Sequence, residues 1–318
     1  MAYKGKVLQS TGLWYRVMLD NNDILQCRIP GKFRLKDIQQ TNPVAVGDNV
    51  SIDIGDDGTG SIVEVHDRFN KITRQATHGR KGEQVLVANV DQAFVVQSLY
   101  QPELKTGFID RFLVTAEAFN VEPLIIINKI DLGKDEDAPF LAAILDLYES
   151  LGYPILLSST YDQESMELLS ERLKDKTSVF IGPSGCGKSS LLNTIQPGLN
   201  RATGEISSFS NKGKHTTTFA ELIPLEIGGY LADTPGIREF GLVHFEAEEI
   251  SYWFPEMRDV RSGCRYYNCT HLHEPDCAVM EAYHNKEIAA SRYESYINIV
   301  ESLQSAEKST GSRKRNSS

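Results

Sequence analysis

The order of three short motifs constrains the fold of this chain more than any other feature of its 318 residues. Asn128-Lys129-Ile130-Asp131 comes first, the glycine-rich segment Gly182–Ser189 second, and Asp233-Thr234-Pro235-Gly236 last. The middle motif has the form G-x-x-x-x-G-K-[ST], which carries meaning only between a strand and a helix. The other two motifs each follow an apolar run, as expected where buried strands end. The three motifs therefore predict an α/β fold with loops at the ends of its strands.

From residue 85 onward, strands and helices are expected to alternate. Four strands are predicted, at Gln92–Val96, Pro123–Ile127, Ile155–Leu157 and Ser178–Ile181. Apolar residues at helical spacing predict helices between them, at Phe108–Phe119, Pro139–Leu151 and Ser165–Leu173. This alternation is typical of a doubly wound α/β sheet.

The glycine-rich segment is expected to bind the phosphates of a nucleotide. Glycines let the backbone approach a phosphate and direct its N–H groups inward, and the helix from about Lys188 adds its positive end. Lys188 is expected to neutralise the β- and γ-phosphates, and the Ser189 hydroxyl to ligate Mg²⁺. The predicted contacts are Gly182, Pro183, Ser184, Gly185, Cys186, Gly187, Lys188, Ser189 and Ser190. This loop alone does not distinguish ATP from GTP.

The first motif supplies that distinction. A carboxylate only accepts hydrogen bonds, and guanine offers two adjacent donors where adenine offers no such pair. Asp131 is therefore expected to bind guanine in a bidentate, charge-assisted contact, with Asn128, Lys129 and Ile130 beside it. Ser158-Ser159-Thr160 follows the next strand; Ser158 and Ser159 are expected to contact the guanine oxygen through backbone N–H groups.

Together these segments resemble the base-binding, phosphate-binding and magnesium-side elements of P-loop GTPases. In an ordinary GTPase the phosphate loop comes first and the base-binding motif late, so the resemblance implies a circular permutation. It also implies that Asp233 holds Mg²⁺ through a water and that the Gly236 N–H faces the γ-phosphate. Lys214–Thr218 resembles the first switch, in which Thr217, or alternatively Thr216, would ligate Mg²⁺.

The residue after the Gly236 position bears on hydrolysis. Ras-like GTPases have a water-orienting glutamine there, whereas this chain has Ile237, which forms no side-chain hydrogen bond. Slow turnover by the isolated protein is therefore expected. His215 is the candidate catalytic residue, activated by a partner that docks on the switches; alternatively it caps a loop or contacts that partner.

The first 65 residues predict a small β-barrel. Five short segments alternate polar with apolar residues, at Lys6–Leu8, Leu13–Leu19, Asp23–Ile29, Asn49–Ile54 and Gly60–Val65. Five short strands in this length fit an OB-type barrel. Such barrels often bind oligonucleotides, although a purely structural or protein-docking barrel is the alternative.

A compact Cys/His cluster follows the predicted sheet. Cys264, Cys269, His271 and Cys277 offer three thiolates and one imidazole, the number a closed, structural zinc site needs. His273 is an alternative fourth ligand, and a loop of reduced cysteines without metal is the alternative to a site. Helices are expected on both sides, one containing Trp253 and Phe254 and one from about Tyr283 to Ala306. Cys27 and Cys186 are not expected to be ligands.

Composition bears on the cellular location of the protein and on its class of partner. No segment has a signal-peptide core or the length of a membrane span, so a cytoplasmic protein without membrane contact is expected, and five cysteines do not suggest a disulfide framework. The net charge of -10 argues weakly against nucleic acid, although local patches decide binding. Two basic runs stand out, Lys32–Lys36 and Arg313–Arg315, the second expected in an irregular tail.

With the barrel, the permuted motifs and the Cys/His spacing together, nearly the whole chain resembles the RsgA family of small-subunit-dependent bacterial GTPases. The resemblance implies an OB-type barrel (1–68), a circularly permuted GTPase domain (69–243) and a mainly helical zinc-binding domain (244–318). It implies a monomeric late maturation factor of the 30S ribosomal subunit that binds GTP, GDP and 16S rRNA. The subunit would stimulate its GTPase, and hydrolysis would release it.

Two other functions are possible for a chain with this phosphate loop, and particular residues oppose each of them. An ATP-dependent P-loop enzyme is opposed by Asp131 and by the lack of an L-S-G-G-Q signature. An RNA-binding scaffold with a vestigial nucleotide site is opposed by the intact Lys188, Ser189 and Asp233.

Overall fold

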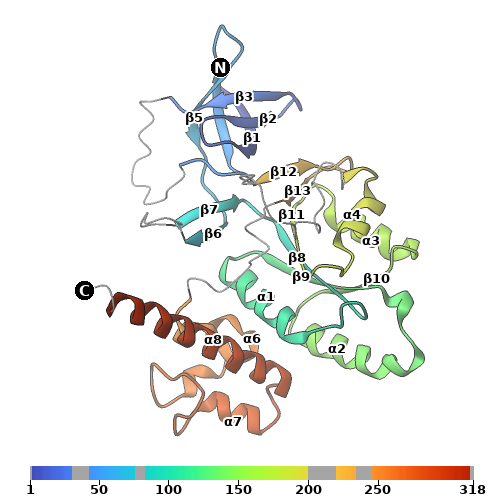
Figure 1. Cartoon of the computed structure of the whole chain (residues 1–318), viewed down its shortest axis with the longest axis vertical. Helices are drawn as coiled ribbons and strands as arrows, with labels where there is room; N and C mark the ends of the chain where they lie inside the picture. The colour runs from blue at the N-terminus through green and yellow to red at the C-terminus, as the bar shows by residue number, and fades with distance from the viewer. Residues whose placement is uncertain (1, 31–42, 76–82, 200–219, 234–244, 316–318) are drawn as a thin grey trace.

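The computed structural model describes residues 2–30, 43–75, 83–199, 220–233 and 245–315, with backbone only at 74–75, 83 and 306–315. Three units follow one another along the chain. The N-terminal barrel and the C-terminal helical unit lie at opposite ends of a central α/β unit (Figure 1). The predicted order of the three units is therefore also their order in space.

The N-terminal unit is a closed five-stranded barrel. Its strands are β1 (Tyr3–Ser10), β2 (Tyr15–Leu19), β3 (Ile24–Arg28), β4 (Asn49–Ile54) and β5 (Gly60–Val65). They pair in the order β1-β2-β3-β5-β4, and β1 closes the ring against β4. Val7, Val17, Val50, Ile52 and Ile62 fill the interior. The predicted barrel is confirmed; the basic run Lys32–Lys36 lies outside the described residues.

A two-stranded ribbon that the sequence did not predict joins the barrel to the central unit. It consists of β6 (Lys71–Gln75) and β7 (Glu83–Ala88), which pair antiparallel. Ile72 and Val87 are buried in the same core cluster as residues of the central sheet. The ribbon therefore packs onto the α/β unit, while Val85 and Ala88 also pack against Ala45 of the barrel unit.

The central sheet has the order β10-β9-β8-β11-β13-β12. Its strands are β8 (Gln92–Ser98), β9 (Glu122–Asn128), β10 (Ile155–Ser158), β11 (Thr177–Ile181), β12 (Glu221–Pro224) and β13 (Tyr230–Asp233). All neighbours pair parallel except β12, which runs antiparallel to β13. β8 is buried along its whole length, which explains the apolar run Ala93–Val96 at its centre.

Helices cover both faces of this sheet. They are α1 (Thr106–Ala118), α2 (Ala138–Ser150), α3 (Gln163–Leu173) and α4 (Lys188–Ile195), with short 3-10 turns at Ile130–Leu132 and Asp135–Asp137. Val95 of β8 shares a core cluster with Phe112 of α1, whereas its neighbour Phe94 shares another with Leu191 of α4. Successive strand residues point to opposite faces, so α1 and α4 cover opposite sides. The doubly wound prediction is confirmed.

The sheet continues from the central unit into the barrel. The edge strand β12 pairs with β1 of the barrel at Glu221 and Gln9. Arg16 of β2 forms a 2.9 Å ion pair with the same Glu221, and the Tyr230 hydroxyl donates to Met18 Sδ at 3.5 Å. These few contacts place the barrel beside β12 and β13.

The C-terminal unit is mainly helical. It contains a 3-10 helix (Ala247–Trp253), α6 (Pro255–Arg258), a 3-10 turn (Arg261–Gly263), α7 (Ala278–His284) and α8 (Ala290–Arg315). Phe254 has extended φ and ψ because a proline follows it, so it separates two helices instead of lying within one as predicted.

The predicted helix from Tyr283 to Ala306 is also wrong in its start. α7 ends at His284, Lys286 adopts a left-handed φ of 65°, and a new helix begins at Ala290. A left-handed residue interrupts an α-helix, which separates Tyr283 from α8. At the other end, the α8 backbone includes Arg313–Arg315, for which an irregular tail was expected.

A buried ionic network attaches the C-terminal unit to the central one. Arg292 of α8 donates to Asp110 of α1 at 2.6 Å and to Glu256 of α6 at 2.7 Å. Tyr148 of α2 and Ser295 also donate to Asp110. Arg292 and Asp110 have no exposed surface, so this contact fixes how the two units meet.

Among the helices of the described residues, none has both the length and the apolar character that crossing a membrane requires.

Candidate nucleotide and metal sites

Three loops meet at the carboxyl ends of the parallel strands β10, β9 and β11, with β8 between the last two. β11 leads into the segment 182–187 and α4, β9 ends at Asn128, and β10 ends at Ser158. In the sheet, Asn128 is in register with Ser98 on one side and Ser158 on the other. The parallel order thus brings together motifs that lie far apart in the sequence, at the edge where α/β proteins bind ligands.

The backbone of the glycine-rich loop adopts conformations and close contacts that a residue with a side chain would not allow. Gly185 and Gly187 have φ values of 85° and 100°, which side chains rarely adopt. A Cβ atom on Gly187 would lie 2.1 Å from Asn128 Nδ2, and one on Gly182 would lie 2.2 Å from the Val96 carbonyl oxygen. The loop therefore excludes any larger residue at these two positions.

The Lys188 ammonium lies over this loop. It donates to the carbonyl oxygens of Gly182 at 2.7 Å and Pro183 at 3.0 Å. A bound phosphate would compete with these carbonyl groups for the same ammonium. Cys186 next to it is buried, and burial raises the pKa of its thiol, so this side chain packs into the loop as a neutral group.

Asn128 connects the base-binding motif to the phosphate loop. Its side-chain amide donates to the Cys186 carbonyl oxygen at 2.9 Å, and it accepts a hydrogen bond from the Ser158 hydroxyl at 3.1 Å. All three residues are buried. Asn128 therefore has a positioning role inside the protein, and Ser158 acts through its hydroxyl as well as through any backbone contact.

Lys129 directly precedes the 3-10 turn of the predicted base-binding motif, and Asp131 lies within that turn. Lys129 has a left-handed φ of 61° and donates to the carbonyl oxygens of Gly185 at 2.7 Å and Gln101 at 2.6 Å. Asp131 is exposed, and the Ser159 hydroxyl donates to one of its carboxylate oxygens at 2.6 Å. Ile130 begins the 3-10 turn that contains Asp131.

The loop after β8 is a part of the site that sequence reasoning missed. Besides the Gln101 carbonyl, Pro102 approaches the Cβ position of Gly185 at 3.7 Å. The Ser98 hydroxyl donates to the Pro102 carbonyl oxygen at 2.7 Å. No motif marked this loop because its contacts use backbone groups.

Of the residues expected around Mg²⁺, only some lie within the described part of the chain. Ser189 and Ser190 lie in the first turn of α4, and Asp233 ends β13, which pairs with β11 beside the phosphate loop. A hydroxyl and a carboxylate are ligands that suit Mg²⁺, so these residues fit the ion. His215, Thr216, Thr217, Gly236 and Ile237 lie outside the described residues.

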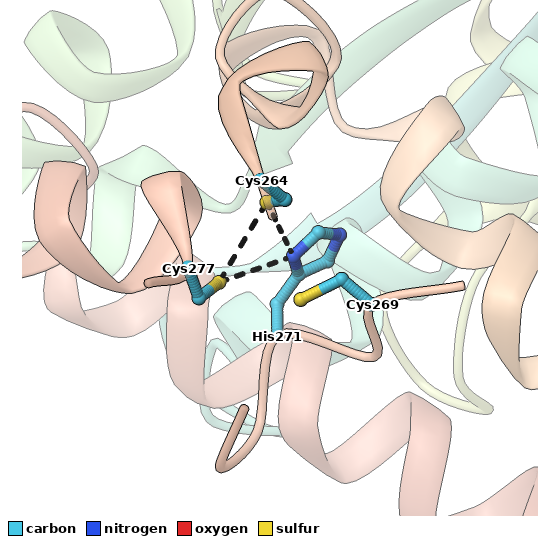
Figure 2. A group of neighbouring side chains, drawn as sticks. All are labelled: Cys264, Cys269, His271 and Cys277. Carbon is cyan, nitrogen blue, oxygen red and sulfur yellow. Dashed lines mark hydrogen bonds between the residues drawn. The ribbon is translucent and has the colours of Figure 1, made fainter. Parts of the chain in front are cut away.

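The second candidate site brings four side chains of one short segment together. The donor atoms of Cys264, Cys269, His271 and Cys277 all lie within 4.8 Å of one another. His271 Nδ1 lies 3.5 Å from Cys264 Sγ and 3.3 Å from Cys277 Sγ, and the two sulfur atoms are 3.9 Å apart (Figure 2). His273 is exposed and lies outside this cluster.

The surrounding residues orient the imidazole. His271 Nε2 lies 3.2 Å from the Ser251 hydroxyl, and the Tyr293 hydroxyl donates to the His271 carbonyl oxygen at 2.6 Å. Burial lowers the pKa of His271 to about 4, so the ring is neutral at pH 7 with Nδ1 directed at the thiols. Neither Ser251 nor Tyr293 carries a local sequence signal, since both come from other helices.

This donor set fits zinc. Three sulfur atoms and one imidazole nitrogen within coordination reach match a closed tetrahedral site, and a second group bonded to the other imidazole nitrogen is typical of zinc ligands. Burial raises the pKa of Cys269 to about 12, so a cation is needed to stabilise its thiolate.

Comparison with known families agrees with this architecture. A family model described as RsgA GTPase matches residues 65–243, and one described as RsgA N-terminal domain matches residues 4–62. A curated relative from Bacteroides thetaiotaomicron, named small ribosomal subunit biogenesis GTPase RsgA 2, is 45% identical over 298 residues. That alignment covers 94% of this chain and 96% of the relative. A similarly named relative from Flavobacterium johnsoniae is 42% identical, covering 93% and 92%.

Two solved structures share the whole arrangement. YjeQ from Thermotoga maritima is similar with a TM-score of 0.78 and 35% identity, covering 96% of this chain and 99% of that one. YloQ, described as a circularly permuted GTPase, is similar with a TM-score of 0.75 and 34% identity, covering 96% of both chains.

Proposed function

The chain belongs to the RsgA family of circularly permuted GTPases, and from this premise we propose that it is a GTP-hydrolysing factor in late maturation of the 30S ribosomal subunit. The observation that carries the proposal is the near full-length identity to relatives named for small-subunit biogenesis. The contact of Asn128 with the glycine-rich loop supports it, because it holds the predicted base-binding and phosphate-binding motifs together at one edge of the sheet.

In this proposal the nucleotide lies across the carboxyl ends of β9, β11 and β10. Asp131 accepts from the two guanine donors, and Ser159 holds its carboxylate in place. The stem of Lys129, anchored by Gly185 and Gln101, supports the base. On the phosphate side, Lys188 exchanges its loop carbonyl contacts for the β- and γ-phosphates, while the backbone of 182–187 surrounds them.

Hydrolysis needs a cation and an oriented water. Ser189, Asp233 and Thr217 would hold Mg²⁺, which neutralises charge on the phosphates when bound. Gly236 would face the γ-phosphate. His215 would orient the attacking water once the subunit orders the switch, because Ile237 cannot do so.

The zinc-binding unit and the barrel would be the two contact regions for the particle. Cys264, Cys269, His271 and Cys277 would hold one structural Zn²⁺, which stabilises a segment too short to bury its own core. We propose the divisions 1–68, 69–243 and 244–318, with the first and last units binding 16S rRNA. The protein would act as a monomer in the cytoplasm, and hydrolysis to GDP would release it.

The test is GTP hydrolysis with and without purified 30S subunits. We expect the subunit to raise turnover at least about tenfold, as activating partners do for other GTPases. Lys188→Ala should abolish turnover in both conditions, while Lys174→Ala, at an exposed helix end, serves as the matched control. Equal rates with and without subunits would contradict the proposal.

The two alternatives have separate tests. Binding of ATP as tight as that of GTP would support an ATP-dependent enzyme instead. Turnover unchanged by Lys188→Ala would support a scaffold with a vestigial nucleotide site.

A further inference from the structure

We propose that the loop between the first two zinc ligands presents a stacking surface for an unpaired RNA base, with Tyr267 as its main contact. This inference rests on the proposed function, because it assumes that the partner is the RNA of a ribosomal subunit. It assigns a specific surface to that interaction and a specific chemistry to its residues.

Four consecutive exposed residues separate Cys264 from Cys269. They are Arg265, Tyr266, Tyr267 and Asn268. Tyr267 has 96% of its surface exposed, more than any other large hydrophobic side chain in the described residues. Exposing an aromatic ring so fully forfeits the free energy of its burial, which a binding partner would recover.

Guanidinium groups lie against aromatic rings on the same loop and next to it. Arg265 lies over the Tyr266 ring at 5.6 Å from its centroid. Arg261, four residues earlier in the chain, lies over the Tyr252 ring at 3.1 Å from its centroid. The result is a set of flat groups with positive charge between them, which we call the tyrosine–arginine surface (Tyr252, Arg261, Arg265, Tyr266 and Tyr267).

The backbone under this surface is fixed before any partner binds. The Cys269 N–H donates to the Tyr266 carbonyl oxygen at 3.2 Å, and the Arg265 N–H donates to Asp276 at 3.2 Å. Both ends of the loop carry zinc-ligand residues. A fixed loop loses less conformational entropy on binding than a flexible one.

The chemistry of the surface favours RNA over a ribosomal protein. Unpaired bases bind by stacking on aromatic rings and on guanidinium planes, and the phosphates beside them attract arginine. Tyrosine anchors of protein interfaces typically enter desolvated pockets with apolar neighbours. Here Tyr267 lies between another exposed tyrosine, Tyr266, and the polar Asn268, with the cation Arg265 one position further, and none of these residues forms a buried apolar pocket. The ion pair of Arg265 with Asp276 is exposed, so a phosphate could displace it at little cost.

The experiment measures the affinity of the full-length, zinc-loaded protein for purified 30S subunits. We expect Tyr267→Ala to weaken binding about 5- to 100-fold, the loss expected for one stacked base, and Tyr267→Phe to stay within about twofold. Phe140→Ala, which removes an exposed ring of the central unit, is the matched control. One zinc per chain in Tyr267→Ala establishes that the loop is intact.

Salt dependence and crosslinking identify the partner. Tyr267→Ala should leave the slope of log Kd against log salt unchanged, whereas Arg265→Gln should make it shallower by about one charge. Ultraviolet crosslinking of the complex should yield a nucleotide adduct on the peptide that contains Tyr267. Wild-type affinity of Tyr267→Ala would overturn the proposal, as would a Tyr267→Phe loss equal to that of alanine. Weakened binding without a nucleotide adduct would assign the surface to a ribosomal protein and also overturn it.

If the proposed function itself were wrong, the wild-type protein would give a different result from the one that refutes the stacking surface. Wild-type protein would then neither bind the subunits nor respond to them in GTP hydrolysis, whatever residue occupies position 267.

Discussion

Replacing Arg292 with methionine tests whether the buried ionic network holds the zinc-binding unit against the GTPase unit. Arg292 is the cation of two short ion pairs, with Asp110 at 2.6 Å and with Glu256 at 2.7 Å. The exposed fractions of these side chains are 1%, 0% and 8%. Methionine preserves most of the volume but leaves two carboxylates buried without their cation.

The size of the effect follows from this burial. Removing one partner of a buried ion pair typically costs about 3–5 kcal/mol, because the remaining charge is desolvated without compensation. Asp110 would keep the hydroxyl donors Tyr148 and Ser295, which limits the loss. Arg292 also lies 4.5 Å from the centroid of the Phe254 ring, a contact worth about 0.5–2 kcal/mol. We expect a loss of about 4 kcal/mol in the free energy of unfolding of the zinc-binding unit.

Urea unfolding followed by tryptophan fluorescence measures this loss. The chain has two tryptophans, Trp14 in the barrel and Trp253 in the zinc-binding unit, so a Trp14→Phe background reports the latter alone. Lys134→Met is the control, because its pair with Glu136 is exposed and worth about 0–1 kcal/mol. The double variant Asp110→Asn/Arg292→Met should lose less than Arg292→Met alone. Equal losses for Arg292→Met and Lys134→Met would refute the reasoning.

Three further predictions concern the two sites. Gly187→Ala should weaken GTP binding at least about tenfold in a fluorescence titration, because its Cβ would lie 2.1 Å from Asn128 Nδ2. Gly198→Ala is the control, because Gly198 has a similar φ of 90° but open space around it, and this variant should bind GTP normally. Asp131→Asn should lower the affinity for GTP and raise the affinity for xanthosine triphosphate in the same titration. The reason is that the asparagine amide can donate to the carbonyl oxygen that replaces the guanine amine in xanthine. An unchanged preference for GTP would mean that Asp131 does not contact the base. His271→Ala should reduce zinc content below one per chain and lower the unfolding midpoint of the Trp253 signal, while His273→Ala should retain the metal. Zinc loss in His273→Ala alone would mean that His273, and not His271, is the ligand.

The backbone of the glycine-rich loop was predictable because it depends on a short, continuous segment of the sequence. A phosphate loop needs glycines at fixed spacing, and Gly185 and Gly187 do have the left-handed φ values that this requires. The barrel was predictable because alternation of polar and apolar residues has the period of a strand, and β2 shows that alternation in its burial. The position of the break between α7 and α8 was not, because Lys286 carries no composition signal for its left-handed φ.

Other features depend on residues that meet only in the folded chain. The loop after β8 contacts Lys129 through the Gln101 carbonyl group, which any residue at that position possesses. Ser251 reaches His271 from a helix twenty residues earlier, and neither residue marks the other in the sequence. The β6–β7 ribbon is short, and its position depends on residues of the central core and of the barrel unit that bury it from both sides.

The sequence by itself determined the family, the permuted order of the GTPase motifs and the Cys/His cluster. These follow from local backbone needs and from side-chain chemistry, which do not depend on distant residues. Only the tertiary structure decided how the units are joined: Glu221 links the sheet to the barrel, and Arg292 links α8 to Asp110 of α1. The physical reason is that a buried charge such as Arg292 needs a partner, and its partner Asp110 comes from another part of the chain, so that their meeting is a property of the fold.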